Sequence, residues 1–564
     1  MTERGCNAVG IDLGTTYSAM AYMDAQNTAR IVQDSSGNAV TASVVLFDDG
    51  EVVVGEFALE QAAVQPERVV QFVKVHMGDE WKFSVDDQTH TPESISGIIL
   101  AALVREAEPQ IGPIDSAVIT VPAFFTEKRR RATQQAGEIA GLNVIGTLNE
   151  PMSAALAYGL YQSDKAETAM VYDLGGGTFD VTIVRISPNE LTELATLGNR
   201  ELGGKNWDEY LINYAAEQFQ NEHGNDPREI LSVKQDLIIS CEEAKRRLTQ
   251  MKKALIRVNA FGKEHVVEIT RDEFEAMTEP LVQTTKLTTE MALEDAELNW
   301  RDISRTVMVG GSTHMPMIRN MLTQVSGRPP DTGVNPVFAV ALGAAKYASL
   351  LEAGSAPKEV VQKRDSCTGT ASDDEHMTLD EPVQPAKKLP KVNFVTAHGV
   401  GVKVKRQDKE SNTVLIPKNS SVPHSVRRNF PISSKTAGDA RSVRIIVTQG
   451  DTQKIELAEV LGTGRITGLP SGSKAGDKVS VTMTFDQEGR LSVEAEHVAS
   501  GSQLKLDLEI PGGLREEEVQ QYREMFLSSG LVERNSGTPD LIAHFESDDD
   551  IDDDDDIMIL TPVY

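Results

Sequence analysis

The sequence predicts a large two-lobed α/β domain followed by an all-β sandwich, one short helix and a disordered acidic tail. Three observations lead to this prediction. Apolar strand-like runs alternate with helical patterns as far as about Ala353, which is typical of α/β proteins. Short alternating strands with turn residues between them follow from Val392 to about Pro511. After Glu546 the chain is dominated by aspartate, which cannot form a packed core.

The 564 residues are too many for one core, because a domain usually has about 100–250 residues. Between the α/β and all-β regions, a segment rich in Ser, Thr, Pro and charge indicates a flexible linker. The run LREEEVQQYREMFLSSG has an amphipathic pattern with acidic residues at its start, which suits the positive end of a helix. We therefore expect an α/β domain at 1–353, a linker at 354–391, a sandwich at 392–512, a helix at 513–534 and a disordered tail at 535–564.

Composition excludes several classes of function. A formal net charge of −30, from 85 acidic and 55 basic residues, argues against a nucleic-acid partner, because phosphates are neutralised by clustered Lys and Arg. The three cysteines, Cys6, Cys241 and Cys367, provide neither a disulfide framework nor paired metal-ligand spacing. The first residues resemble neither a secretory signal nor a membrane span. We expect a cytoplasmic protein with no membrane partner.

An internal repeat points to phosphate binding. AVGIDLGTTYSAMAYM contains Asp12, and AMVYDLGGGTFDVTIVRI contains Asp173, which lies 173 − 12 = 161 residues later. Each segment reads as a β-hairpin whose Gly and Thr tip exposes backbone N–H groups that can bind phosphate oxygens. The two aspartates are suited to hold Mg²⁺ or its waters between two lobes. The alternative interpretation is that each tip is an ordinary hairpin turn.

A third element strengthens the interpretation as a nucleotide site. The run TVMVGGSTHMPMIRNML around Val307 predicts a buried strand, a Gly-Gly turn, a Ser or Thr suited to N-capping, and a helix. A strand that leads through glycines into a helix is a common seat for anions and nucleotides.

Five motifs together resemble the seventy-kilodalton heat-shock chaperone family, and the resemblance extends to about Gly513. The motifs are IDLGTTYS, VYDLGGGTFD, TVPAFFTEKRRRATQQAGEIAGL, NEPMSAALAYGL and VGGSTHMP, in the order and approximate spacing of that family. The resemblance implies an actin-like domain that binds ATP and hydrolyses it slowly, followed by a sandwich that binds exposed apolar polypeptide. It also implies unfolded or extended polypeptides as partners, with a J-domain protein and a nucleotide exchange factor as cochaperones.

The resemblance also implies roles for individual residues in the nucleotide site. Metal binding falls on Asp12 and Asp173, with Mg²⁺ and, as a further candidate, K⁺. Catalysis falls on Lys74, Glu150, Asp173, Thr178 and Asp180. ATP contacts fall on Gly14, Thr15, Thr16, Tyr17, Gly175, Gly176, Gly177, Thr178, Glu242, Lys245, Arg246, Thr249, Gly310, Gly311, Ser312 and His314. Without the resemblance, Lys74 reads as a surface charge and the segment SCEEAKRRLT as an exposed charged helix.

Two further groups follow from the resemblance. Pro122 and Arg130 match positions that relay the nucleotide state between domains, although fixing φ and reaching a carboxylate are ordinary structural roles. The peptide-pocket candidates are Val402, Phe430, Val443 and Ile445. Alternating apolar residues of this kind also fill sandwich cores, which is the competing interpretation.

The sequence departs from the family pattern at five places. His314 stands where an arginine is usual, and Lys205 and Asn206 replace an acidic pair. The stretch from Met77 to Ile119 is shorter. The linker is long and polar, and a single predicted helix follows the sandwich in place of a helical lid, so we expect weak trapping of peptide.

Two alternatives to a chaperone stay open at this stage. One is a scaffold whose nucleotide state controls partner binding, which the unusual linker and missing lid favour. The other is a small-molecule kinase on the actin-like fold, which would leave the sandwich without a purpose.

Overall fold

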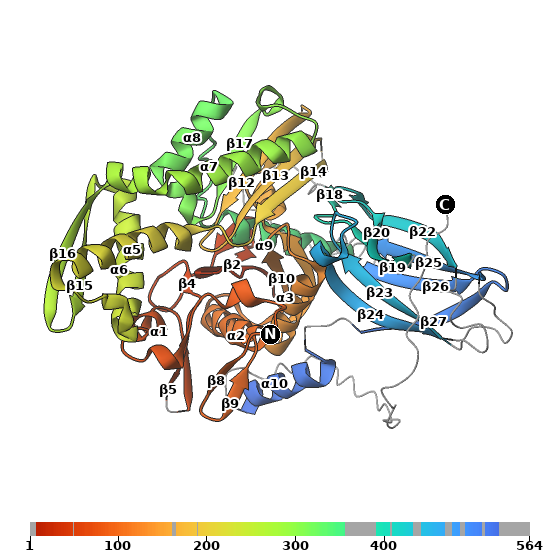
Figure 1. The fold of residues 1–564 in the computed structure, drawn as a ribbon, viewed down its shortest axis with the longest axis horizontal. Coiled ribbons are helices and arrows are strands. Elements are labelled where there is room, and N and C mark those ends of the chain that lie inside the picture. Colours follow the sequence, from red (N-terminus) through yellow and green to blue (C-terminus); the bar gives the residue numbers. More distant parts are fainter. Residues whose placement is uncertain are drawn as a thin grey trace, which may run out of the picture.

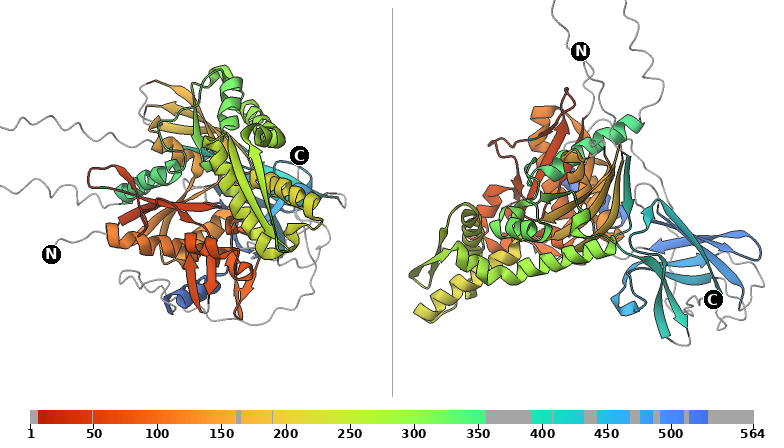
Figure 2. Two further views of the ribbon diagram at one scale, coloured as in Figure 1. Left: turned by 90° about the vertical axis from the view of Figure 1, so that its left-hand side faces the viewer. Right: turned by 90° about the horizontal axis from the view of Figure 1, so that it is seen from above.

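The computed structural model describes residues 7–48, 50–160, 165–188, 190–355, 391–406, 409–431, 442–467, 476–485, 491–509 and 514–528. It confirms the predicted fold class, with a two-lobed α/β domain and a separate β-rich domain beside it (Figures 1 and 2). Residues 356–390 of the predicted linker 354–391 and the whole predicted tail 535–564 lie outside the described residues, while Gly354 and Ser355 end a helix and Lys391 begins a strand. Among the described helices, none is both long and apolar enough to span a membrane.

The first lobe is built on a sheet with the order β11-β10-β1-β2-β3, with β4 paired to β2. The strands β1, β10 and β11 run parallel, whereas β1 and β2 form the predicted antiparallel hairpin. The bounds of these strands are β1 (Asn7–Asp12), β2 (Tyr17–Met23), β3 (Ala29–Ile31), β4 (Thr41–Ala42), β10 (Ile114–Val121) and β11 (Asn143–Asn149).

The second lobe repeats this plan, which confirms the repeat seen in the sequence. Its sheet has the order β17-β12-β13-β14-β18-β21, with β12 parallel to β17 and antiparallel to β13. The bounds are β12 (Glu167–Leu174), β13 (Phe179–Ser187), β14 (Glu190–Asn199), β17 (Arg305–Val309), β18 (Lys391–Val395) and β21 (Ser421–Val422). The last two strands come from the chain that begins at the final residue of the predicted linker, Lys391, so the start of the β-rich region is part of the sheet of the second lobe.

Helix α9 (Ala339–Ser355) packs closely on the first sheet, and α4 (Glu150–Ala157) packs on α9. Small residues make this approach possible. A Cβ added at Gly10 would lie 2.0 Å from the backbone N of Ala345, and one at Gly343 would lie 1.7 Å from the carbonyl O of Ser153. Glycine is therefore required at both positions, because any side chain would push α9 away from the sheet or from α4.

Helices cover the outer faces of both sheets, and small β elements extend each lobe (Figure 1). In the hairpin of the second lobe, β15 (Lys253–Ala260) alternates exposed residues with buried Ala254, Ile256, Val258 and Ala260, the period of a strand with one buried face. In the first lobe these elements are β5 (Val45–Asp48), β6 (Glu51–Val54), α1 (Glu56–Gln61), β7 (Val69–Val70), β8 (Phe83–Val85), β9 (Gln88–His90), α2 (Pro92–Ile111) and α3 (Glu127–Ile139). In the second lobe they are α5 (Gly204–His223), α6 (Leu231–Gln250), β15 (Lys253–Ala260), β16 (Lys263–Thr270), α7 (Arg271–Asp295) and α8 (Pro316–Ser326).

The β-rich domain is an eight-stranded sheet with the order β20-β19-β23-β24-β27-β26-β25-β22, folded around a core of alternating apolar side chains. The strands are β19 (Val400–Arg406), β20 (Lys409–Ile416), β22 (His424–Pro431), β23 (Ser442–Gln449), β24 (Glu459–Thr467), β25 (Lys478–Phe485), β26 (Leu491–His497) and β27 (Ser502–Glu509).

The helix predicted after the sandwich is present as α10 (Glu516–Ser528), with its acidic residues in the first turn. It lies against the first lobe beside β8 and β9, as Figure 1 shows. Val519 and Phe526 join the core of that lobe, and the hydroxyl of Tyr522 donates to the carbonyl O of Thr89 at 2.8 Å. The helix is thus a part of the first lobe in its packing.

Candidate active site

A cleft of about 1090 Å³, including its open mouth, lies between the two lobes. Residues from both hairpin tips, from α6 and from the turn after β17 line it together. The predicted residues in its lining are Asp12, Gly14, Thr15, Thr16, Tyr17, Lys74, Glu150, Asp173, Gly175, Gly176, Thr178, Glu242, Lys245, Arg246, Thr249, Gly310, Gly311 and Ser312.

The two glycine-rich tips meet across the cleft. A Cβ added at Gly176 would lie 2.0 Å from Oγ1 of Thr16, and one at Gly177 would lie 2.7 Å from Cγ2 of Thr15. Any larger residue at these two positions would separate the tips. The first tip is held by Ser43, whose hydroxyl donates to the carbonyl O of Gly14 at 2.9 Å. The two glycine-rich turns therefore face one another, as the repeat predicts.

The turn after β17 is correctly predicted as strand, glycines and helix, but its hydroxyls act differently from the prediction. The residue before α8 is Met315, and it makes no side-chain cap. The hydroxyl of Ser312 instead donates to the carbonyl O of Gly175 at 2.8 Å, and that of Thr313 donates to the carbonyl O of Gly310 at 2.7 Å. Ser312 therefore ties the turn to the second glycine tip, whereas Thr313 closes the turn on itself.

A buried charged cluster lies beside the glycine tips. The Nζ of Lys74, in the short helix η2 (Val73–His76), lies 2.6 Å from Oε1 of Glu150, the first residue of α4. Asp12 is the last residue of β1, Asp173 is the last but one of the equivalent strand β12, and their charges act on this pair. The four side chains come from four separate elements, and Asp173 is the one that the second lobe contributes.

Burial and mutual repulsion oppose ionisation of the acids in this cluster. Burial, followed by the charge of Glu150, raises the pKa of Asp12 to about 7. The same causes raise the pKa values of Asp173 and Asp180 well above their ordinary range. Burial alone would lower the pKa of Lys74, but the charges of Glu150 and Asp12 outweigh it and hold that pKa above its usual value. The cluster favours a cation in its midst.

Two of the carboxylates have an oxygen without a hydrogen bond. Oδ2 of Asp173 and Oδ1 of Asp180 are buried and make none, while the other oxygen of Asp180 accepts from the N–H of Ala123 at 3.3 Å. Free buried carboxylate oxygens are the donors that a hard divalent cation prefers. The residues present therefore fit a magnesium ion.

On the side of α6, Tyr17 from the first lobe meets Arg246 from the second. The guanidinium carbon of Arg246 lies 4.8 Å from the centre of the Tyr17 ring, a cation–π contact across the mouth of the cleft. Burial and the nearby charge of Glu242 raise the pKa of Tyr17 to about 12. The Nζ of Lys245 lies 2.7 Å from Oδ2 of Asp208 and so is held by a residue that the sequence analysis did not identify.

Three predicted residues do not line the cleft. Gly177 lies behind its tip against Thr15, and Asp180 lies behind the carboxylate cluster at Ala123. His314, at the end of the short helix η6 (Gly311–His314), is exposed. The lining also includes residues that sequence reasoning missed, namely Val40, Lys205, Asp208, Met315, Pro336, Val337 and Val340. Of these, Lys205 carried a signal, because it stands beside the second glycine tip in place of an acidic residue.

Pro122 and Arg130 lie at the junction with the β-rich domain. Pro122 directly follows β10, and its carbonyl O accepts from the N–H of Phe125 at 3.1 Å. The Nη2 of Arg130 donates to the carbonyl O of Ala123 at 3.0 Å and to Oδ1 of Asn149 at 2.7 Å. Burial lowers the pKa of Arg130. Arg130 therefore bonds to neutral oxygens, whereas the sequence analysis considered a carboxylate partner.

A second cavity of about 560 Å³ joins Arg130 to the β-rich domain, with Thr396, His398 and Gln449 in its opposite wall. Asn149 also donates to Oε2 of the buried Glu193 at 3.5 Å, and the same oxygen accepts from the N–H of Val395 in β18 at 3.4 Å. Burial raises the pKa of Glu193 to about 7. A continuous polar chain thus runs from α3 to the strand that leads into the sandwich.

The predicted peptide-pocket residues lie inside the sandwich. Val402, Phe430 and Ile445 are at most 1% exposed and belong to one core cluster. Val443 lies in β23, and its side chain is outside the described part of the structure. In the described conformation the three described side chains therefore fill the core and are not presented to solvent.

The fold and the cleft define an ATPase of the actin-like class, with two related lobes, paired glycine tips and a buried cluster of acids around one lysine. A sequence model of the Hsp70 protein family matches residues 8–86, 81–365 and 386–552. The chain belongs to the Hsp70 family, and it is an ATP-dependent molecular chaperone.

Curated relatives agree with this assignment over nearly the whole chain. It is 37% identical over 524 residues to the chaperone protein DnaK of Halobacterium salinarum, covering 92% of this chain and 77% of that protein. It is 36% identical over 533 residues to the chaperone protein DnaK of Thermotoga maritima, covering 93% and 84%. It is 35% identical over 527 residues to the chaperone protein DnaK of Thermosipho africanus, covering 92% and 82%.

Proposed function

We propose that this chaperone hydrolyses ATP in the cleft and uses its nucleotide state to control how the sandwich binds extended apolar polypeptides. The observation that most supports the proposal is the buried Lys74–Glu150 pair among Asp12 and Asp173, directly beside the two glycine tips that touch. Positive and negative groups fixed in this way are the main source of catalysis in phosphoryl transfer.

In this mechanism backbone N–H groups of both tips bind the phosphates, and Thr178 supports the second tip through its carbonyl O, which accepts from the N–H of Gly175 at 3.0 Å. Asp12 and Asp173 would hold Mg²⁺, which when bound offsets the negative charge of the phosphate oxygens. Lys74 would face the terminal phosphate, Glu150 in the wall of the cleft would orient the attacking water and accept its proton, and Asp180 would act from behind the cluster through its charge. A K⁺ ion is a further candidate for the same acidic surroundings.

The nucleoside would lie between the second lobe and the mouth of the cleft. Glu242, Lys245, Arg246 and Thr249 are on one helix, α6, and line this side. Lys245 is already oriented by Asp208, and Arg246 by the ring of Tyr17. An adenosine bound here would contact both lobes, so its presence would favour their closed arrangement.

Control of the sandwich rests on the strand that connects it. β18 pairs with β14 through Glu190 and Lys391, Leu191 and Val392, and Thr192 and Asn393, so it extends the sheet that carries the second glycine tip. The polar chain from Arg130 through Asn149 and Glu193 to Val395 adds a contact from the first lobe. A change in lobe closure would alter both contacts and thereby the position of the sandwich.

The test is ATP turnover by the full-length protein with and without an unfolded apolar peptide. Coupling predicts that the peptide increases turnover, and that Asn149→Ala reduces this increase while peptide-free turnover is retained. The matched control is Asn143→Ala, since Asn143 lies at the other end of the same strand and is exposed. If peptide does not change the turnover of the wild type, the proposed coupling is wrong. The proposal that the cleft hydrolyses ATP would not be affected by that result.

Partners and location complete the proposal. Extended apolar polypeptides are the proposed substrates, and a J-domain protein and a nucleotide exchange factor are the proposed cochaperones. A cytoplasmic location is proposed from the low count of 3 cysteines, which suits a reducing compartment. The one described cysteine, Cys241, is a buried free thiol.

A further inference from the structure

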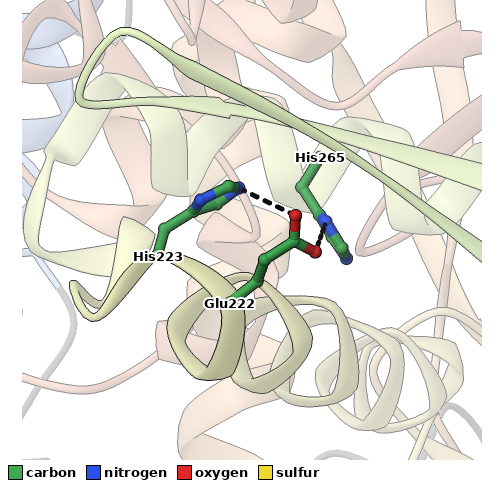
Figure 3. A group of neighbouring side chains, drawn as sticks. All are labelled: Glu222, His223 and His265. Carbon is green, nitrogen blue, oxygen red and sulfur yellow. Dashed lines mark ion pairs between the residues drawn. The ribbon is translucent and has the colours of Figure 1, made fainter.

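Three side chains that can bind a metal meet at the end of α5 on the second lobe. Glu222 and His223 are the last two residues of α5, and His265 comes from the hairpin strand β16 (Figure 3). One potential ligand atom from each side chain lies within 4.8 Å of the other two. The Nδ1 of His265 is 2.9 Å from Oε2 of Glu222, and the Nε2 of His223 is 3.9 Å from Oε1 of the same carboxylate.

This cluster is separate from the cleft. The other end of α5 touches the second glycine tip, where the N–H of Gly204 donates to the carbonyl O of Gly175 at 2.9 Å. With its 20 residues, α5 places its two ends about 30 Å apart. None of the three side chains is in the lining of the cleft. A metal bound to them would therefore be distinct from the magnesium proposed for ATP.

Packing holds both imidazoles toward the carboxylate. The fully buried ring of Phe219 lies one turn before His223 on α5, and the two rings meet edge to face with centroids 4.6 Å apart. His265 packs on the same phenyl ring, and the centroids of the two imidazoles are 5.8 Å apart. Both histidines are mostly buried, with side chains 17% and 19% exposed, so each loses little rotamer freedom when a ligand binds.

One ring nitrogen of the cluster lacks a hydrogen-bond partner. The Nε2 of His223 is buried and makes no hydrogen bond, and 3.9 Å is too long for one to Glu222. Buried polar atoms without partners are rare in folded proteins, since each lowers stability. A metal ion between the three side chains would give this nitrogen a partner.

We propose that Glu222, His223 and His265 form a Zn²⁺ site that joins the end of α5 to the β15–β16 hairpin. Two imidazole nitrogens and one carboxylate oxygen suit Zn²⁺, whereas Mg²⁺ and Ca²⁺ prefer oxygen alone. Bond lengths of about 2.0–2.1 Å place the ligand atoms of a tetrahedral zinc site about 3.3 Å apart, so small side-chain rotations complete it. Glu222 is 58% exposed, which leaves room for water as the fourth ligand.

The bound ion would stabilise the second lobe and would take no part in catalysis. Its ligands come from two elements that are separated along the chain by α6 and β15, and the ion would fix their relative positions. Because the ion binds the folded lobe and requires both elements in place, it raises the melting temperature by an amount that grows with the logarithm of the ratio of its free concentration to its dissociation constant.

The test uses the full-length protein, stripped of metal with a chelator, and Zn²⁺ alone as the probe. Calorimetry is expected to find one site whose affinity falls more than about 100-fold in His265→Gln and in His223→Gln, since both remove a direct ligand. Zn²⁺ should raise the melting temperature of the wild type and should have a much smaller effect on the variants. Excess Mg²⁺ should not displace it. With Co²⁺ in place of Zn²⁺, strong visible absorption bands would report the tetrahedral geometry.

The matched controls keep Glu222, His223 and His265 and remove a histidine or a carboxylate elsewhere. His424→Gln removes a histidine from β22, and Glu264→Gln removes the exposed carboxylate next to His265, and both should bind Zn²⁺ as the wild type does. All variants should hydrolyse ATP at the wild-type rate and melt normally with chelator present. If both histidine variants keep wild-type zinc affinity, or if Co²⁺ shows the weak bands of octahedral oxygen ligation, the metal is held elsewhere and the proposal is wrong. Should one variant fail to fold, the other decides the outcome.

Discussion

Lys74 and Glu150 form a buried ion pair at the wall of the cleft, with 2.6 Å between Nζ and Oε1 and less than a tenth of either side chain exposed. Asp12 and Asp173 lie near the pair, and the positive charge of Lys74 favours their ionised forms as well. Its role in catalysis can be separated from its role in stability, because the two charges can be removed singly or together.

Lys74→Ala is expected to reduce ATP turnover by about 100-fold or more, since a fixed charge at the terminal phosphate is lost. It should also lower the free energy of unfolding by about 3–5 kcal/mol, because Glu150 would stay buried without its partner. The double variant Lys74→Met with Glu150→Gln should recover most of this stability and none of the activity. Steady-state turnover and urea denaturation measure the two effects. Near-wild-type turnover in Lys74→Ala would rule out its catalytic role, and the same holds for Asp173→Asn.

Glu193 predicts a pH dependence of stability. Burial raises its pKa from 4.5 to about 7, so between these values the native state keeps a proton that the unfolded state has released. The contribution of this group to stability therefore falls as the pH rises through that window and is constant above it. Glu193→Gln removes the effect, so the variant should gain stability relative to the wild type between about pH 5 and about pH 8. Urea midpoints at several pH values measure the difference, and a constant difference would contradict the raised pKa.

Lys205 is expected to bind the phosphates of the nucleotide. Its N–H donates to the carbonyl O of Gly176 at 2.8 Å, and it lines the cleft. Burial lowers the pKa of His76 in the first lobe, and the positive charge of Lys205 lowers it further. The charge of Lys205, in the second lobe, is therefore felt in the first lobe. Lys205→Glu should weaken ATP binding by about tenfold and adenosine binding much less. The exposed Lys234 on α6 provides the control Lys234→Glu, and equal losses for both nucleotide and nucleoside would argue against a phosphate contact.

His314 is exposed and does not line the cleft, so a side chain at this position must be long to reach the adenine. A neutral imidazole lacks the permanent charge and wide fork of arginine, so His314→Arg should tighten ATP binding if the longer side chain reaches the base. Calorimetry with ATP measures it, and GTP provides the comparison for a contact with the base. Unchanged or weaker ATP binding would mean that this position makes no contact with adenine.

Helix α10 is expected to stabilise the first lobe rather than to retain peptide on the sandwich. Phe526 is fully buried in the first-lobe core, and Gln135 bonds to both the N–H and the carbonyl O of Leu514 just before the helix. Phe526→Ala should therefore lower the free energy of unfolding by about 3–5 kcal/mol, whereas Glu524→Ala on the exposed side should not.

Peptide release gives the second readout for α10. In stopped-flow experiments a labelled apolar peptide should leave quickly in both nucleotide states, from the full-length protein and from a chain that ends at Gly513. If ADP slows release many-fold in the full-length protein and the truncation abolishes this effect, the segment after the sandwich acts as a lid.

Motifs that are local in the sequence predicted the shape of the cleft well. A strand that ends in Asp-Leu-Gly before a Gly and Thr turn can be predicted from its own residues, because the turn needs small residues and the strand needs apolar ones. Both hairpins, the strand and glycines around Gly310, and the helix at Glu516 are therefore present as predicted. The role of Asp208 was missed, because a single charged residue on a helix gives no signal of its direction, and Lys205 was noted only as a departure from the family pattern.

The sequence by itself determined the two related lobes, the sandwich and the carboxylates at Asp12 and Asp173, since each depends on residues that are near neighbours in the chain. Only the tertiary structure decided which distant residues meet. Lys74 contacts Glu150, 76 positions away in the sequence, and Gln135 contacts Leu514, 379 positions away. No local sequence pattern predicts the packing that brings these residues together. Whether an apolar strand residue faces a pocket or the core is decided in the same way, and the packing of the whole sheet buries Val402, Phe430 and Ile445. Local chemistry sets what a residue can do, and long-range packing sets what it touches.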